Sequence, residues 1–224
     1  MKKVAFLLSA GKGERLRGRE TKTPKAFVKI RNKCLLLWSL DKLLKFSDYV
    51  VVAVPPGFVK KAENLISTDK EKIFVVEGGK TRQESLLNCF SFFDTMGLKA
   101  DIIVEHDAAR PFFSQQLLKN VISTAEKYGA CIPVIDVFDT ARIVKKANFV
   151  TDVDRRYLKL VQTPQGFKYE IFKKCATLHI SGTDGASLLL KSNVKVKIIQ
   201  GERMNIKITN KEDLKIAKII SMSF

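Results

Sequence analysis

Short apolar segments alternate with segments of helical periodicity from residue 4 to residue 135, and this alternation restricts the possible fold more than any other feature. The apolar segments are continuous, which is typical of strands that are buried on both faces of a parallel sheet. Strands are expected at 4–8, 49–54, 72–77, 101–105 and 130–135, and helices at 34–44, 58–66, 81–96 and 114–128. This order predicts an α/β fold with a Rossmann-like, mostly parallel twisted sheet and helices on both faces.

The regular alternation stops at about Val137. Residues 137–165 are polar and basic, and their pattern predicts an exposed β-hairpin that protrudes as an arm over about 137–160. A long excursion of this kind usually serves a binding site or a partner. Further helices are expected at 170–178, 184–191 and 211–220, a strand at 194–199, and a short extended piece at 26–30. The length of 224 residues is consistent with a single domain.

Polar or charged segments follow three of the expected strands. Ser9–Lys25 follows the first strand, Gly78-Gly79 the third, and His106–Pro111 the fourth. Ligands of open α/β sheets bind beyond the carboxyl ends of the strands. The three segments are therefore expected to form one site.

The segment after the first strand has the composition of a phosphate-binding loop. Gly11 and Gly13 allow a tight turn whose amides can point at an anion, and Arg15 and Lys25 supply positive charge. The spacing of a Walker A loop is absent, and Leu16 stands where a dinucleotide fingerprint has its third glycine. We interpret the segment as a nucleotide-phosphate loop of another kind.

The charge of the chain is strongly basic, with a formal net value of +17. Residues 1–45 carry thirteen Lys and Arg against three acids. A basic surface favours nucleic acids and phosphorylated small molecules alike, so a non-enzymatic nucleic-acid-binding protein is one alternative. Such a protein would need aromatic residues among the basic ones, and the first basic cluster has only Phe27. We therefore expect no nucleic-acid partner.

Widely spaced cysteines in apolar surroundings predict buried free thiols. They form no Cys-x-x-Cys pair, and the two histidines complete no zinc pattern. No apolar run reaches the roughly 20 residues that span a bilayer, and no segment resembles a signal peptide. We expect a cytoplasmic protein without membrane contact. The cysteines are Cys34, Cys89, Cys131 and Cys175.

The loop and a series of later motifs resemble one enzyme family. Ala-Gly-x-Gly-x-Arg at 10–15 with Pro-Lys at 24–25 is similar to the sugar-phosphate nucleotidyltransferases. Gly-Gly at 78–79 with Arg82 and Ser85 resembles the base and ribose side of a pyrimidine nucleotide pocket. The motifs that match the 2-C-methyl-D-erythritol 4-phosphate cytidylyltransferases in order are Glu105–Pro111, Asp136–Thr140, Val153–Arg155, Gln162–Gln165, Thr183-Asp184 and Asn205–Thr209. The resemblance extends over essentially the whole chain.

This resemblance implies transfer of CMP from CTP to 2-C-methyl-D-erythritol 4-phosphate, with release of pyrophosphate, in non-mevalonate isoprenoid precursor synthesis. Arg15 and Lys25 would stabilise charge on the α-phosphate. Arg155 and Lys207 would hold the acceptor phosphate. The implied nucleotide-binding residues are Ala10, Gly11, Lys12, Gly13, Gly78, Arg82, Ser85 and Ala108. The implied acceptor-binding residues are Asp107, Arg110, Thr140, Thr163 and Thr183.

The resemblance also implies a divalent metal, with Mg²⁺ as the expected ion and no protein ligands assigned. It implies a homodimer in which the arm crosses to the other subunit, so that Thr140 and Arg155 act in trans. Two features depart from the family pattern: Arg17-Gly18-Arg19 lengthens the first loop, and Gly185 stands where an acidic residue is commoner. Ribitol 5-phosphate is an alternative acceptor, because it too is a small phosphorylated polyol.

Overall fold

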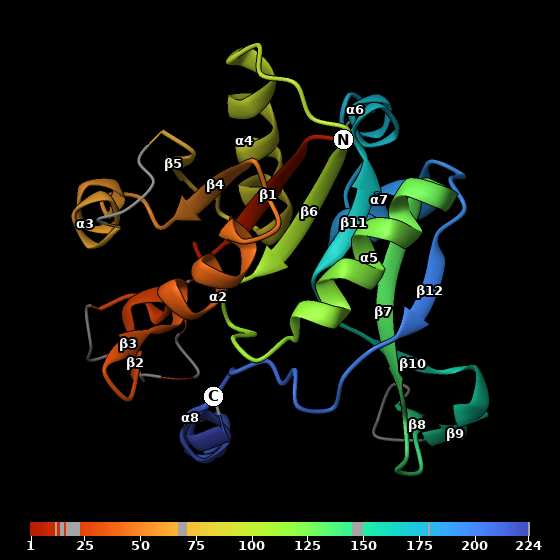
Figure 1. Ribbon diagram of the computed structural model, residues 1–224. Helices are drawn as coiled ribbons and strands as arrows, with labels where there is room; N and C mark the ends of the chain where they lie inside the picture. The colour runs from red at the N-terminus through yellow and green to blue at the C-terminus, as the bar shows by residue number, and fades with distance from the viewer. Residues whose placement is uncertain are drawn as a thin grey trace.

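A computed structural model describes residues 1–11, 13, 16, 23–66, 71–144, 150–178 and 180–223. Its centre is an eight-stranded sheet in the order β10-β7-β11-β6-β1-β4-β5, with β12 paired to β7 (Figure 1). The predicted mostly parallel sheet is confirmed, because β1 pairs in parallel with β4 and β6, β4 with β5, and β12 with β7. One half of the sheet consists of β1 (Lys3–Leu8), β4 (Tyr49–Val54), β5 (Ile73–Glu77) and β6 (Ile102–Asp107).

The other half of the sheet is mixed. One short strand, β11, lies between β6 and β7 and runs antiparallel to both. The sequence analysis did not predict it, because its four residues, two of them buried polar or glycine, show no strand periodicity. The strands of this half are β7 (Ala130–Asp136), β10 (Lys159–Val161), β11 (Gln165–Lys168) and β12 (Lys197–Gln200).

Helices cover both faces of the sheet, as predicted (Figure 1). On β1, Ala5 and Leu7 face one apolar core, and Val4 and Phe6 face the other. The first core is closed by α2 (Leu35–Leu44), α3 (Val59–Leu65) and α5 (Gln115–Tyr128). The second is closed by α4 (Arg82–Thr95), α6 (Tyr169–Ala176) and α7 (Gly185–Lys191).

Side-chain caps fix where the helices around the site begin. Thr81 caps α4 by accepting from the Glu84 amide at 3.0 Å, which confirms the predicted N-cap. The Glu84 carboxylate, however, accepts from the Lys80 amide at 2.7 Å and not from the cap residue. Asp184 caps α7 by accepting from the Ser187 amide at 2.8 Å. The caps therefore hold the loops that precede α4 and α7 in place.

The segment expected to be extended at 26–30 is a strand only over its last two residues, because it begins within a 3₁₀ turn. It consists of η1 (Lys25–Phe27), followed by the two-residue strands β2 (Lys29–Ile30) and β3 (Lys33–Cys34). A third, smaller core joins this region to the C-terminal helix α8 (Lys211–Ile220), which leads into η4 (Ser221–Ser223). Leu16 of the first loop and Ile208 are buried in this core, so the two distant segments pack together.

The predicted hairpin arm is confirmed. It consists of β8 (Arg142–Val144) and β9 (Val150–Asp152), which pair antiparallel, followed by η3 (Arg155–Tyr157). The arm projects from the sheet beside β7 and β10 (Figure 1).

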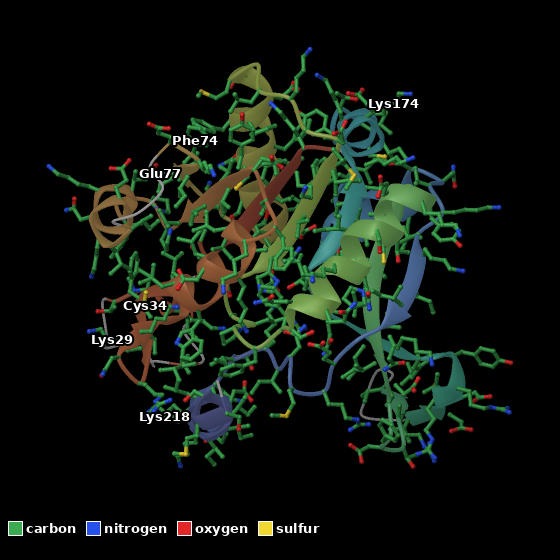
Figure 2. The ribbon with its side chains drawn as sticks, viewed as in Figure 1. Lys29, Cys34, Phe74, Glu77, Lys174 and Lys218 are labelled. Carbon is green, nitrogen blue, oxygen red and sulfur yellow. The ribbon has the colours of Figure 1, made fainter. Side chains whose placement is uncertain are left out.

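The four cysteines are unpaired and buried, as predicted. Among the described residues, no helix is both long and apolar enough to cross a membrane. Much of the positive charge is spread over outer helices: Lys174 on α6 and Lys218 on α8 are exposed there (Figure 2).

Candidate active site

Predicted nucleotide-binding residues from three segments are in contact at the carboxyl ends of β1 and β5. A Cβ added at Gly78 would lie 2.2 Å from Ala10 Cβ and 2.9 Å from Ser85 Oγ. The Ser85 hydroxyl accepts from the Gly79 amide at 3.1 Å and donates to the Thr81 carbonyl at 2.9 Å. Glycine at 78 is therefore required for the loops after β1 and β5 to approach the first turn of α4. Contact of these residues with a nucleotide stays a prediction.

The glycine-rich loop and Lys25 also approach each other closely. Gly13 has a φ of +68°, and a Cβ there would lie 2.6 Å from Lys25 Cβ. Burial raises the pKa of Asp213 on α8, but hydrogen bonds from Thr209 and Asn210 and the charge of Lys25 lower it below its ordinary value. Lys25 therefore lies within electrostatic reach of the C-terminal segment. Lys12 and Arg15 lie outside the described residues.

Asp107, at the end of β6, is held between two cations. Arg82 Nε donates to Oδ1 at 2.8 Å, and Lys207 Nζ lies 2.7 Å from Oδ2. Burial alone would raise the pKa of Asp107, but Arg82 and Lys207 outweigh it and hold the pKa well below its ordinary value. Asp107 is therefore ionised at neutral pH. The structure thus brings together one residue from each predicted group: nucleotide-binding, acceptor-binding and catalytic.

Arg82 contacts a second carboxylate, that of Glu105. Glu105 is fully buried, with Arg82 Nη1 against its Oε1 and the Gly185 amide 3.0 Å from its Oε2. Burial raises the pKa of Glu105 to about 7, and the charge of Arg82 opposes that shift. Sequence reasoning gave Glu105 no role. The signal was available, because Glu105 directly follows the apolar residues Ile102–Val104 of an expected buried strand, and a buried acid is expected to have a partner.

His106 points to the opposite face of β6 and is also fully buried. Its Nε2 lies 3.1 Å from the Arg110 carbonyl, and its Nδ1 lies 3.0 Å from Thr163 Oγ1. The same hydroxyl accepts from the Asp107 amide at 3.1 Å. Burial lowers the pKa of His106 to about 3, so the imidazole is neutral. It has the backbone-holding contacts of a structural residue.

Arg110 and Asn205 connect the loop after β6 to the segments on either side. Arg110 Nη1 donates to the Asn205 carbonyl at 2.9 Å and Nη2 to the Val161 carbonyl at 3.3 Å. The Asn205 amide group donates to the Thr163 carbonyl at 2.8 Å, next to the cis Thr163–Pro164 bond. Burial lowers the pKa of Arg110. These contacts fix the backbone from which Lys207 extends.

The remaining predicted residues lie at different distances from the Arg82–Asp107–Lys207 contacts, some beside them and some on the arm. The Ala108 amide donates to the Leu8 carbonyl at 3.0 Å, beside the start of the glycine-rich loop. Thr183 is exposed at the end of the loop before α7, with its carbonyl 3.5 Å from Arg82 Nη1. Thr140 and Arg155 are exposed on the arm, and Arg155 contacts the Phe138 carbonyl there. No described contact joins these two arm residues to Asp107 or Lys207.

The carboxylates of the site do not form a metal cage. Over the residues that the structure describes, no group of three or more His, Cys, Asp or Glu side chains converges on one point. Both Asp107 oxygens face cations, and Asp184 accepts from Gln165 and Ser187. The described side chains therefore assign no protein ligands to a divalent metal.

Several cations surround one ionised carboxylate, beside a glycine-rich loop at the carboxyl edge of a parallel sheet. This arrangement suits a ligand that carries several phosphates. His106 is no candidate for a general base, because it is fully buried and both of its ring nitrogens contact protein groups. The cations around Asp107 suit positioning and charge stabilisation. The fold and site define an enzyme of the nucleotidyltransferase class.

Comparisons with known proteins identify the family within this class. The model of the 2-C-methyl-D-erythritol 4-phosphate cytidylyltransferase family matches residues 4–223, and the chain belongs to this family. The enzyme of that name from Thermosipho melanesiensis is 36% identical over 216 residues, covering 94% of each chain. That from Caldicellulosiruptor bescii is 34% identical over 224 residues, covering 98% of this chain and 97% of the relative.

Solved structures agree with this assignment. The crystal structure of 2-C-methyl-D-erythritol 4-phosphate cytidylyltransferase from Thermus thermophilus superposes with a TM-score of 0.79 at 29% identity. The match covers 99% of this chain and 100% of that one. The resemblance inferred from the motifs is thereby confirmed.

Proposed function

We propose that the protein transfers CMP from CTP to 2-C-methyl-D-erythritol 4-phosphate, which gives 4-diphosphocytidyl-2-C-methyl-D-erythritol and pyrophosphate. The observation that carries the proposal is the Arg82–Asp107–Lys207 cluster at the carboxyl end of β6. Family membership and the names of the relatives support the choice of both substrates. The reaction belongs to isoprenoid precursor synthesis.

In this reaction a phosphate oxygen of the acceptor attacks the α-phosphorus of CTP. The new bond joins that oxygen to the α-phosphorus, and the bond from the α-phosphorus to the bridging oxygen breaks. Pyrophosphate leaves with the electron pair. A phosphate monoester has a second pKa of about 6, so the attacking oxygen is ionised at neutral pH. No general base is required.

The cations have separate roles in the proposal. Lys25, together with Arg15, opposes the charge that develops around the α-phosphorus. Lys207 holds the acceptor phosphate, and Asp107 holds Lys207 in place by the 2.7 Å contact. Arg155 adds a second cation for that phosphate. A bound Mg²⁺ would neutralise charge on the triphosphate.

We further propose a homodimer in which the arm of each subunit reaches the partner's site and supplies Thr140 and Arg155. The apolar side chains of the arm support an interface, since a monomer would leave them in water. They are exposed by 52% to 84%: Phe138, Ile143, Val144, Val150 and Tyr157. We place this single cytidylyltransferase domain in the cytoplasm, where unpaired cysteines such as these four persist.

A pyrophosphate-release assay tests the function. With CTP and Mg²⁺, turnover is expected to be faster with 2-C-methyl-D-erythritol 4-phosphate than with ribitol 5-phosphate. The reverse order would overturn the proposed acceptor, and no release with either would overturn the reaction.

The role of Lys207 is tested by substitution. Lys207→Ala is expected to lower turnover roughly 10²-fold or more, because one cation at the reacting phosphates is lost. Lys211→Ala, an exposed lysine at the start of α8, is the matched control and should leave turnover unchanged. Equal effects of the two substitutions would contradict the assignment.

A further inference from the structure

Glu105 is a buried carboxyl group to which the proposed reaction assigns no role. It lies two residues before Asp107 on the same face of β6 and is fully buried. A buried carboxylate is strongly unfavourable unless opposite charge and hydrogen bonds compensate for its lost hydration. Oε1 forms an ion pair with Arg82 Nη1, and Oε2 accepts from the Gly185 amide at 3.0 Å.

The Glu105 carboxylate occupies the space that a side chain at position 185 would need, and glycine has no such side chain. A Cβ added at Gly185 would lie 2.2 Å from Glu105 Oε2 and 2.7 Å from Phe167 Cε2. Because non-bonded atoms do not approach so closely, the Glu105 carboxylate and a side chain at 185 exclude each other. Gly185 is also the first residue of α7, where backbone amides have no partner within the helix. The carboxylate therefore satisfies that amide as well.

Arg82 is thereby held by three groups from two segments, the end of β6 and the loop before α7. Glu105 on β6 contacts Nη1 from the interior, Asp107 accepts from Nε at 2.8 Å, and the Thr183 carbonyl before α7 lies 3.5 Å from Nη1. A free arginine side chain samples many rotamers. Fixing it in advance reduces the entropy that is lost when a ligand binds.

We propose that Glu105 is a positioning residue: it fixes the Arg82 guanidinium on the nucleotide side of the site and ties the start of α7 to it. Glu105 touches neither substrate and acts through Arg82. The inference rests on the proposed function and on the prediction from the sequence that Arg82 is one of the CTP-binding residues.

Glu105→Gln is the first test, because it keeps the shape of the side chain and removes its charge. The dissociation constant and the KM for CTP are expected to rise about tenfold, as for the loss of one charged hydrogen bond. The KM for the acceptor should stay unchanged. Glu77→Gln is the matched control, since Glu77 (labelled in Figure 2) accepts from the Gly57 amide at 2.9 Å without contacting Arg82. Unchanged CTP affinity in Glu105→Gln would overturn the proposal.

Relocating the carboxylate is the second test. Standard bond lengths put aspartate oxygens about 2.4 Å from Cβ, close to the distance that separates a Cβ at 185 from Oε2. Glu105→Ala is expected to weaken CTP binding at least as much as Glu105→Gln. Adding Gly185→Asp should recover part of that binding, because it returns a carboxylate near Arg82, although its Cβ lies 2.7 Å from Phe167 Cε2. Gly185→Asp alone should weaken binding, because two carboxylates would share one space. A folded double variant no better than Glu105→Ala would overturn the proposal.

Urea unfolding separates positioning from folding. If Glu105 were purely structural, its substitution would lower the free energy of unfolding and leave the CTP affinity of the folded variants unchanged. This result would contradict the proposal. CTP affinity, measured by calorimetry, does not depend on the acceptor. Failure of the wild type to turn over the methylerythritol acceptor would therefore contradict the proposed function and leave the test of Glu105 intact.

Discussion

His106 is kept in one protonation state by its neighbours. Its Nε2–H donates to the Arg110 carbonyl, so Nδ1 accepts the hydroxyl proton of Thr163. The Thr163 oxygen is then free to accept from the Asp107 amide. The Nε2–H, the hydroxyl and the amide each donate one hydrogen bond in this arrangement, and a proton on Nδ1 would break it. The hydroxyl of Thr163, predicted to contact the acceptor, is thus occupied within the protein, and its contact with a substrate stays a prediction.

Acid is expected to destabilise the fold through His106. Its pKa is lowered from 6.5 to about 3, so the unfolded chain binds more protons than the folded one between these values. The free energy of unfolding therefore falls as pH is lowered from 6.5 toward 3. Urea unfolding at pH 7, 5.5 and 4 should show wild type losing more stability than His106→Gln, which does not titrate. Parallel losses in the two proteins would contradict this account.

Alanine substitution at two glycines near the nucleotide loop is expected to change the free energy of unfolding by different amounts. Gly78→Ala places a Cβ 2.2 Å from that of Ala10 and should cost roughly 1–3 kcal/mol of stability, as overpacking does. The Cβ of Gly11→Ala meets no atom of the described residues within 4 Å, and the substitution should change stability by less than about 0.5 kcal/mol.

CTP binding gives the second measurement on this pair. If the loop cradles the triphosphate by close backbone approach, Gly11→Ala should raise the KM for CTP while urea unfolding stays unchanged. A Gly11→Ala enzyme with wild-type KM would show that the nucleotide does not approach position 11.

Outside residues 25–34, the elements of the first 135 residues were predictable because each strand has a continuous apolar run and each helix an apolar face. This signal comes from burial on both sides of a parallel sheet, and it is local. β11 lacks it, since its place between β6 and β7 is set by pairing with strands far along the chain. The 3₁₀ turn Lys25–Phe27 was missed for a similar reason. Its two buried residues are too few to show a periodic pattern, and their burial depends on packing with other segments.

The candidate site was predictable as a set of segments but not as a set of contacts. The strand ends showed where Asp107 would lie, and motif order indicated Lys207 and Arg82. That Arg82, Asp107 and Lys207 would form one cluster depends on contacts across 25 and 100 positions of the chain, which no local pattern encodes. The relation between Glu105 and Gly185 was equally unpredictable, because the Glu105 carboxylate fills the space of a side chain at a position far along the chain.

For the whole molecule, charged and apolar side chains are concentrated in two different places. The strand ends gather cations around Asp107, whereas the arm carries exposed apolar residues. Arg155 contacts only arm residues within the described chain, although it is predicted to hold the same phosphate as Lys207. A partner subunit would reconcile the two positions, since a symmetric dimer can exchange arms between its two sites.

Complementation tests the exchange of arms directly. Arg155→Ala and Lys207→Ala should each be nearly inactive alone, because each removes one cation from every site. In a mixed dimer, one site combines the wild-type Lys207 of one subunit with the wild-type Arg155 of the other. Random exchange of equal amounts should therefore restore about one quarter of wild-type activity, since half of the dimers are mixed and each has one intact site of two. Light scattering should report a dimer throughout. A monomer, or a mixed dimer without recovered activity, would show that Arg155 does not act in trans.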